Sequence, residues 1–301
     1  MVTPGRRPAP REAGDALARE LCAVAVAAAR KAGEELLARC GRPPIGLRAK
    51  SGPADFVTAS DRAAEASIAA VLAHRRPEDG LLGEEGTCDR LGATGLRWVV
   101  DPLDGTANYV YGIPFWCVSI ACEDTDGTVA GVVFDPVRDE LFSAARGQPA
   151  QCNGAVIERR AGRALREAAV GGMVACATDA QAKRHGKLDR RLYRRVGQRR
   201  SLGAAALELA WTAAGRLDVC YQEQRLHPWD VDAGLLLCRQ AGLRVHRLPP
   251  LKAGLAPRLL AAPPALSGQL LEAIGPPVKQ RRRAAGRERP HAEHAAETPA
   301  R

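Results

Sequence analysis

Neither a membrane span nor a signal peptide is expected from this sequence. No stretch approaches 18 uninterrupted apolar residues, so no membrane span is expected. The alanine-rich residues 21–29 follow a start that mixes Arg and Glu, and they lack a convincing cleavage site. That segment therefore favours an amphipathic helix over a signal peptide. No internal repeat is evident either, and we expect a cytoplasmic protein that makes no membrane contact.

Cysteine patterns typical of a zinc finger or a disulfide framework are also missing. The nine cysteines form no C-x-x-C pair, and no His lies at zinc-finger spacing from them. An odd number of scattered cysteines, most of them in apolar contexts, fits reduced and buried thiols in a cytoplasmic protein. They are Cys22, Cys40, Cys88, Cys117, Cys122, Cys152, Cys176, Cys220 and Cys238.

Positive charge is concentrated in a few segments. The formal net charge is +10, yet residues 183–200 alone hold nine Lys or Arg against one Asp, and residues 1–13 and 279–301 are also basic. The rest of the chain is mildly acidic, as a metal-binding cleft requires. The basic segments leave open a regulator that binds RNA or another polyanion. Nucleic-acid-binding segments often alternate basic residues with aromatic ones, but Tyr193 is the only aromatic residue among the arginines of 183–200. A solvated helix face explains these arginines equally well.

The length and composition allow two folded units. A chain of 301 residues with 46% hydrophobic content can build two domains with cores of their own, and the sequence changes character near residue 160. We expect a disordered N-terminal arm over 1–13, a metal-binding α+β domain over 14–158, a C-terminal α/β substrate domain over 159–275, and a disordered basic tail over 276–301.

Hydrophobic periodicity and turn residues predict the elements of both units. Helices are expected over residues 14–40, 62–74, 187–196, 201–214, 230–241 and 267–274, with Ser60 or Asp61 as the N-cap of the second. Strands are expected over 81–86, 98–100, 115–122, 128–134, 140–144, 150–157, 168–176, 217–221, 243–246 and 258–261.

Residues 98–109, W-V-V-D-P-L-D-G-T-A-N-Y, are the stretch with the most chemical information. A short apolar strand delivers Asp101 and Asp104, three residues apart, at its C-terminal end. Pro102 lacks an N–H and restricts Asp101 to extended backbone, so the strand is expected to stop there. Gly105 and Thr106 are typical of a helix start, where free amides hold an anion.

Two carboxylates beside an anion seat would repel a phosphate unless cations lay between them. The motif therefore indicates hard divalent metals that bridge carboxylate and phosphate oxygens. A lone D-x-x-D is equally explained as a pair of turn caps. Two further acidic motifs, L-L-G-E-E-G at 81–86 and H-P-W-D-V-D-A-G at 227–234, strengthen the metal interpretation.

These three motifs, in this order, resemble the inositol monophosphatase family of metal-dependent, lithium-sensitive sugar and polyol phosphatases. The resemblance extends over residues 14–274. It implies a two-domain layered α-β-α-β-α sandwich of mixed α+β and α/β class, and it implies a homodimer. It also implies a Mg²⁺-dependent phosphomonoesterase that acts on inositol monophosphate or a similar polyol or sugar phosphate. Histidinol phosphate, fructose 1,6-bisphosphate and 3′-phosphonucleotides are alternative substrates.

The resemblance assigns two or three Mg²⁺ ions to a set of oxygen ligands. The implied ligands are Glu84, Asp101, the backbone carbonyl of Leu103, Asp104 and Asp230, with Glu85 behind them. Asp101 would bridge two ions. Taken alone, Asp230 is equally well explained as a helix cap, and Asp232 departs from the family by adding a negative charge two residues further on.

The resemblance also assigns catalytic and substrate-binding roles. Thr106 and Asp61, assisted by Glu84, would orient and deprotonate the attacking water. The implied substrate-binding residues are Asp104, Gly105, Thr106, Gly203, Ala205 and Glu223, and Lys50 would lie near the mouth of the site. Small residues such as Gly203 and Ala205 at a helix start are also explained by packing alone.

Overall fold

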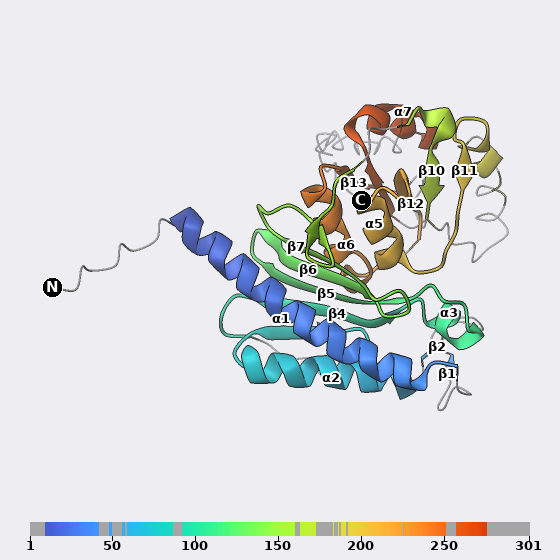
Figure 1. The fold of residues 1–301 in the computed structure, drawn as a ribbon. Coiled ribbons are helices and arrows are strands. Elements are labelled where there is room, and N and C mark those ends of the chain that lie inside the picture. The colour runs from blue at the N-terminus through green and yellow to red at the C-terminus, as the bar shows by residue number, and fades with distance from the viewer. Residues whose placement is uncertain are drawn as a thin grey trace, which may run out of the picture.

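The computed structural model describes residues 10–41, 48–49, 56–57, 59–86, 92–159, 163–172, 183, 186, 188–190, 192–224, 226–250 and 257–275. Helices and sheets alternate in five layers, α-β-α-β-α, as the sequence predicts (Figure 1). Two long N-terminal helices form the first layer: α1 (Pro10–Arg39) and α2 (Ala59–Arg75). A two-stranded ribbon, β1 (Arg48–Ala49) and β2 (Phe56–Val57), lies beside them.

The second layer is a seven-stranded sheet with the order β3-β4-β5-β6-β7-β8-β9. Only β3 and β4 run parallel, and every later pair is antiparallel. Its strands are β3 (Gly80–Gly83), β4 (Arg97–Asp104), β5 (Cys117–Asp124), β6 (Gly127–Asp135), β7 (Glu140–Ala145), β8 (Gln151–Cys152) and β9 (Ala155–Val156). The short helix α3 (Thr106–Tyr111) follows β4 directly.

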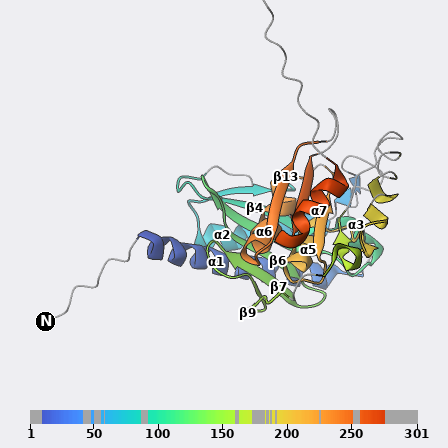
Figure 2. The ribbon, with the colours of Figure 1, turned by 90° about the horizontal axis from the view of Figure 1, so that it is seen from above.

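The remaining layers lie on the other face of this sheet. Helices α5 (Ala205–Ala213) and α6 (Pro228–Gln240) separate it from a five-stranded sheet with the order β11-β10-β12-β14-β13. Helix α7 (Pro264–Ile274) covers the outer face of that second sheet, as the view from above shows (Figure 2). The strands are β10 (Ala169–Gly171), β11 (Gln198–Arg199), β12 (Val219–Gln222), β13 (Arg244–Leu248) and β14 (Arg258–Ala262).

Three cores fill the spaces between the layers. Successive side chains of a strand point to opposite faces, so Trp98 and Val100 of β4 enter the core under α1 and α2, whereas Val99 enters the central core with α5 and α6. In β14, Leu259 and Leu260 divide between the central and outer cores in the same way. Both faces of each sheet are buried, which is why these strands are apolar runs rather than alternating patterns.

Several helices begin earlier in the chain than predicted. Helix α1 starts at Pro10 rather than at residue 14, and α6 and α7 also start at a proline, Pro228 and Pro264. Proline suits the first helical position because its φ is already helical and its missing N–H has no partner there. The prediction followed the apolar residues and so placed these starts too late. Helix α2 starts at Ala59, which puts Asp61 in the first turn instead of at the cap.

Helix α5 shows the opposite difference, since it starts at Ala205 and not at residue 201. Gly203 has φ +86°, a left-handed conformation outside the helix. In the predicted helix 187–196, residues 188–190 and 192–193 are helical, and a turn begins at Arg194.

The prediction that β4 stops at Asp101 is wrong. The strand continues to Asp104, with an irregular register against β5 between Asp101 and Asp104. Its pairing with β3 ends at Val100, so Pro102 lies at a bulge where no partner needs its missing N–H.

Other predictions fall outside the described residues or remain untested. Lys50, Cys88, Cys176, residues 1–9 and the tail 276–301 lie outside the described ranges. The chain passes from the first sheet to the second between β9 and β10, but the division into domains at residue 158 stays a prediction. In the described ranges the cysteines are free thiols: Cys22, Cys40, Cys117, Cys122, Cys152, Cys220 and Cys238. Within those ranges, no helix has the length and apolar character that a membrane span needs.

Buried Asp79 joins α2 to the start of β4. Its carboxylate accepts hydrogen bonds from Arg76 Nε (2.8 Å), Thr94 Oγ1 (2.7 Å) and Trp98 Nε1 (3.0 Å), and Arg76 also binds Glu20 of α1. Burial alone would raise the pKa of Asp79, but these bonds outweigh it and hold the pKa below its ordinary value.

Asp79→Ala is therefore expected to lower the free energy of unfolding by about 2–3 kcal/mol at pH 7, because three donors lose a charged acceptor. Because the pKa of Asp79 is lower in the folded protein than its unfolded value of about 3.8, its ionised carboxylate stabilises the fold at pH values above about 3.8. This stabilisation is lost as the pH falls through the folded pKa. Urea unfolding at pH 7 and pH 3 measures both effects. A variant as stable as Asp126→Ala, a change at an exposed turn residue, would contradict the prediction.

Candidate metal centre and active site

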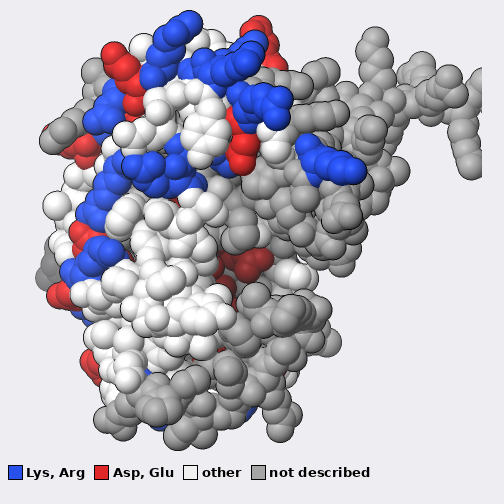
Figure 3. Space-filling view, turned by 90° about the vertical axis from the view of Figure 1, so that its right-hand side faces the viewer, with Lys and Arg blue, Asp and Glu red and all other residues white. Residues whose placement is uncertain are grey.

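Two of the predicted metal-binding motifs meet where the parallel pairing of β3 with β4 ends in the first sheet. Gly83 of β3 lies opposite Val100 of β4, and the Glu84 amide donates to the Val100 carbonyl (3.0 Å). Glu84 therefore lies beside Asp101 of β4, at the point where the pairing of β3 with β4 ends. Figure 3 shows acidic atoms at the bottom of a recess on the face of the molecule that it presents.

Asp101 is buried within a group of carboxylates. It is 2% exposed, and its Oδ1 accepts a hydrogen bond from the Leu103 amide (2.9 Å), which fixes the bulge after Pro102. Burial raises the pKa of Asp101 well above its ordinary value, and the charges of Glu84, Asp104 and Asp230 raise it further, as does a hydrogen bond with Glu84. Four carboxylates, from β4, from α6 and from the residue that follows β3, thus interact around one buried position.

Asp104 connects the first sheet to helix α5. Its carboxylate accepts from the amides of Ala205 (3.1 Å), Ala206 (2.7 Å) and Leu207 (3.4 Å), and thereby caps the N-terminus of α5 from another part of the chain. Burial raises the pKa of Asp104 to about 8, with a further contribution from Asp230, although the three amides oppose the shift.

Asp230 is presented by the first turn of α6. His227 is the N-cap, and Asp230, at the third helical position, accepts from the His227 amide (2.5 Å). Ser119 of β5 donates to the Trp229 carbonyl (3.0 Å) and fixes this turn against the sheet. Helix α6 also packs closely on β6, because a Cβ at Gly131 would lie 2.9 Å from Ala233 Cα.

Asp232, which departs from the family pattern, has its charge compensated locally. Its carboxylate accepts a hydrogen bond from Arg247 of β13 (2.6 Å). Burial raises the pKa of Asp232, and Arg247 counteracts that shift. The additional acid therefore forms an ion pair between α6 and the second sheet.

Thr106 and Asp61 are brought together from residues 45 apart. The Thr106 hydroxyl lies 3.2 Å from Asp61 Oδ1 and 3.0 Å from the Leu103 carbonyl, so both oxygens can accept its proton. Asp61 is 1% exposed in the first turn of α2. Gly105 caps α3 with φ +91°, and a Cβ there would approach the Phe115 carbonyl to 3.1 Å, so only glycine fits without strain.

The predicted substrate-binding residues divide into two groups. Gly203 and Ala205 lie beside the motif, since Gly203 is next to Asn108 and the Ala205 amide binds Asp104. Glu223 is buried, and its Oε2 accepts from the Tyr221 hydroxyl (2.8 Å). Glu85 contributes its backbone amide, which donates to Glu65 Oε2 (2.9 Å).

Sequence reasoning missed three polar residues that build the site. Asn108 was part of the quoted motif, but nothing in the sequence indicated its partner 94 residues away, the Leu202 carbonyl. Glu208 is a buried acid in α5, and Glu65 is a buried acid in α2 whose carboxylate would lie 2.5 Å from a Cβ at position 83. In each case the only sequence signal was an acid or amide within an otherwise apolar helical pattern.

The donor set suits a hard divalent cation. All the predicted ligands are oxygens. The pKa values of Asp101 and Asp104 are raised by burial first and by the charge of neighbouring carboxylates second, and a cation would relieve both effects. Among the residues that the structure describes, no three acidic, His or Cys side chains are arranged to hold a metal ion as they stand. Hydrogen bonds occupy them instead, since Asp104 binds the α5 amides and Asp230 binds the His227 amide.

Comparisons with known proteins agree with this architecture. The model of the inositol monophosphatase family matches residues 17–281. An inositol-1-monophosphatase of Rhizobium meliloti (strain 1021) is 41% identical over 224 residues, which cover 73% of this chain and 82% of the relative. Nus factor SuhB of Escherichia coli (strain K12) is 38% identical over 223 residues, with the same coverage. The crystal structure of extragenic suppressor protein suhB from Bartonella henselae aligns with a TM-score of 0.76 at 34% identity, covering 85% of this chain and 98% of that one.

The five layers, with acidic residues at the shared end of β3 and β4, define a protein of the layered α-β-α-β-α class. The family match covers well over half of the chain, and both relatives exceed 30% identity over more than two thirds of it. The chain belongs to the inositol monophosphatase family.

Proposed function

We propose that this protein is a Mg²⁺-dependent phosphomonoesterase that hydrolyses inositol monophosphate or a similar polyol phosphate. The observation that carries the proposal is the burial of Asp101 among Glu84, Asp104 and Asp230, close to the Thr106–Asp61 pair. A buried group of acids is costly to fold unless it binds cations, so a functional reason for it is required. The inositol-1-monophosphatase relative supports the activity.

Each acidic residue has a role in this proposal. Glu84, Asp101, the Leu103 carbonyl, Asp104 and Asp230 would hold two or three Mg²⁺ ions, and Glu85 would support them from behind. Bound Mg²⁺ would neutralise the charge of the phosphate ester and lower the pKa of a water molecule. The amides of Gly105 and Thr106 would bind the phosphate oxygens.

Thr106 and Asp61 would manage the attacking water. Asp61 accepts a hydrogen bond from the Thr106 hydroxyl. This bond would orient a lone pair of the hydroxyl oxygen towards the attacking water, so that Thr106 could accept a hydrogen bond from that water. In the reaction the water oxygen forms a bond to phosphorus, the bond to the ester oxygen breaks, and the departing alkoxide takes up a proton. Glu84 would assist the loss of the water proton.

A phosphate-release panel tests the proposal. Wild-type protein is assayed with and without Mg²⁺ on inositol monophosphates, histidinol phosphate, fructose 1,6-bisphosphate and phosphoadenosine phosphate. We expect Mg²⁺-dependent release that is fastest on an inositol or similar polyol monophosphate. We also expect the Asp104→Asn variant to lose that release. No release from any of these esters with Mg²⁺ present would contradict the proposed activity.

A second candidate function is polyanion binding. One relative is named a factor, Nus factor SuhB, rather than an enzyme. Figure 3 shows that Lys and Arg gather on the upper part of the face that carries the acidic recess. Within the segment 183–200, Arg190, Arg194, Arg195 and Arg200 are exposed.

Ion pairs reduce the charge that this surface has available. Arg199 binds Asp189 (3.2 Å), and Arg216 pairs with Glu140. Retention of RNA that weakens steeply with salt, without any phosphate release, would favour the regulator over the enzyme. The double variant Arg194→Glu/Arg195→Glu should abolish that retention if the regulator is correct.

The resemblance to the family also leads us to propose a homodimer, inhibition by lithium and a cytoplasmic location. Light scattering would measure the first, and adding Li⁺ to the phosphate-release assay would measure the second. Nucleic-acid binding is not proposed as the main role.

A further inference from the structure

One residue beside the proposed active site, Leu202, has both of its backbone polar groups bound to side chains. The Leu202 amide donates to Glu208 Oε1 (2.6 Å), and the Leu202 carbonyl accepts from Asn108 Nδ2 (2.7 Å). Leu202 immediately precedes Gly203, and both lie in the loop that leads into α5. The N–H of Leu202 is therefore bound to a side chain of α5, and its C=O is bound to a side chain of α3.

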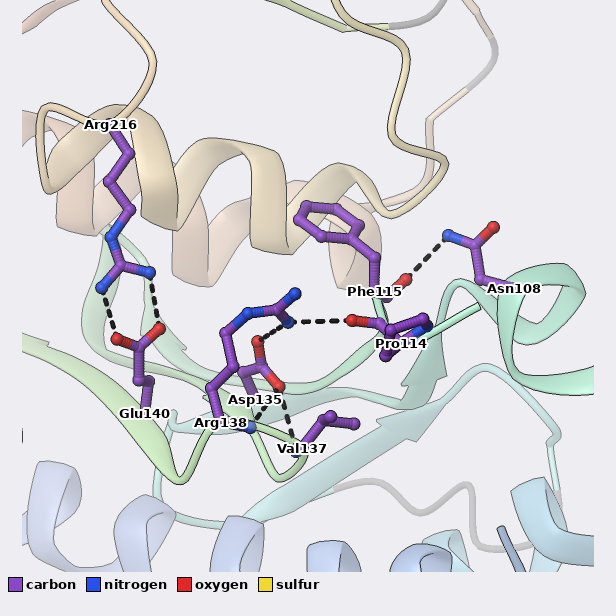
Figure 4. Close-up of polar contacts among 8 residues, drawn as sticks. All are labelled: Asn108, Pro114, Phe115, Asp135, Val137, Arg138, Glu140 and Arg216. Atoms are coloured by element: carbon purple, nitrogen blue, oxygen red, sulfur yellow. Dashed lines mark hydrogen bonds and ion pairs between the residues drawn. The ribbon is translucent and has the colours of Figure 1, made fainter. Parts of the chain in front are cut away.

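Asn108 joins three segments of the chain through a single carboxamide. Its Nδ2 donates to the Leu202 carbonyl and also to the Phe115 carbonyl (2.7 Å), towards which it points in Figure 4. Asn108 itself lies in α3, two residues after Thr106. The loop before α5 is thus tied to the helix that carries the predicted catalytic threonine.

Glu208 binds the backbone N–H of Leu202. It is 1% exposed, and it accepts hydrogen bonds from the Leu202 amide, the Gly172 amide and Gln222 Nε2 (2.7 Å). A carboxylate at such a buried position is retained only when its acceptor capacity is used. These donors come from the loop, from the residue after β10 and from β12, so Glu208 connects the loop to the second sheet.

The loop in turn fixes α5 against the first sheet. Gly203 has φ +86°, and a Cβ at this position would approach Asn108 Nδ2 to 3.1 Å, so the backbone lies directly against the Asn108 side chain. Two residues later, the α5 amides bind Asp104. Movement of the Leu202 backbone would therefore move Gly203 and Ala205 relative to Asp104.

We propose that Asn108 and Glu208 are positioning residues that set the placement of Gly203 and Ala205 against the 101–106 motif. They thereby determine the preference for phosphate esters whose alcohol carries several hydroxyls. This inference rests on the proposed phosphatase function, because the polyol must contact the loop while the phosphate is held by the motif.

Steady-state kinetics with two substrates test the inference. Asn108→Ala and Glu208→Ala should raise KM for inositol 1-phosphate about tenfold, since the loop loses one hydrogen bond of about 1.4 kcal/mol. The effect on kcat/KM for p-nitrophenyl phosphate, which has no polyol to position, should be smaller, so that the ratio of the two kcat/KM values changes. Glu208→Gln retains an oxygen that can accept from the Leu202 amide, and it should restore most of the selectivity.

Amide hydrogen exchange of the metal-free protein gives a readout that does not depend on activity. Exchange in residues 201–207 should accelerate in Asn108→Ala and Glu208→Ala. Asn153→Ala is the matched control, because Asn153 also makes two hydrogen bonds, to the Leu141 amide and the Asp139 carbonyl, at a turn elsewhere in the first sheet. That variant should change neither the exchange of 201–207 nor the ratio of the two substrates.

The outcomes separate this inference from the proposed function. Wild-type protein that releases no phosphate from either ester would contradict the proposed function and, with it, the role in selectivity. Active wild-type protein whose Asn108→Ala variant loses both activities equally would overturn the inference and leave the phosphatase standing. Unchanged exchange over 201–207 in Asn108→Ala would overturn it as well.

Discussion

The Asp101→Asn variant is expected to lose phosphatase activity by about 10³-fold or more, because it removes the carboxylate proposed to bridge two cations. The same variant should be at least as stable as wild-type protein when metal-free. Asp101 is buried, and its pKa is raised above its ordinary value by burial and by Glu84, Asp104 and Asp230. Such a group stabilises the fold below its unfolded pKa of about 3.8, and this stabilisation is lost as pH rises through the folded pKa. At pH 7 an uncharged asparagine avoids that cost.

Two measurements on the same protein check this result. Phosphate release gives the activity, and urea unfolding in the presence of a chelator gives the free energy of unfolding. Asp126→Asn, at an exposed position in the β5–β6 turn, is the matched control and should change neither quantity. An Asp101→Asn variant with wild-type turnover would contradict the metal centre, and one that fails to fold would contradict the account of the buried charge.

Thr106→Ala is expected to lower kcat by about 10²- to 10⁴-fold while KM stays within about threefold, as for the loss of a positioned acid–base group. The hydroxyl lies between Asp61 Oδ1 and the Leu103 carbonyl, and alanine removes the oxygen proposed to accept a hydrogen bond from the attacking water. The expected effect falls on kcat because the contact with water matters in the transition state more than in substrate binding.

Thr106→Ser separates the hydroxyl from the methyl group. Serine keeps the oxygen and should retain most of the activity, within about tenfold of wild type because the rotamer is less restricted. Initial rates at saturating Mg²⁺ measure both variants. Equal activity of Thr106→Ala and wild-type protein would contradict a catalytic role for Thr106, and equal loss in both variants would assign the effect to packing.

Local sequence patterns predicted the site residues at the ends of the apolar runs, whereas Asp61, Thr106 and Asp230 were assigned to the site through the family resemblance. Glu84 follows the apolar strand β3 and Asp101 follows the apolar residues 98–100 of β4, and the parallel pairing of these residues places the two acids side by side. The short α3 after Gly105 was also predictable from the glycine and the threonine. The α-β-α-β-α layering was predicted from the resemblance of the three ordered motifs to those of the family. The periodicity of single elements contributed less to that prediction.

Contacts between distant segments were not predictable from local sequence patterns. The binding of Asp104 to the amides of α5 joins residues about 100 apart, and no local pattern announces it. The continuation of β4 through Pro102 depends on the end of its pairing with β3, which is a tertiary fact. Helix starts at Pro10 and Pro228 were misplaced because the apolar residues that guided the prediction begin later than the helices do.

The most direct test of the account is a crystal structure determined with Mn²⁺ in place of Mg²⁺, in which anomalous scattering locates the metal independently of the protein model. The account predicts anomalous peaks within bonding distance, about 2.0–2.3 Å, of carboxylate oxygens of Asp101 and of at least two of Glu84, Asp104 and Asp230. Fully occupied Mn²⁺ elsewhere, with these four carboxylates bound only to protein donors, would contradict it.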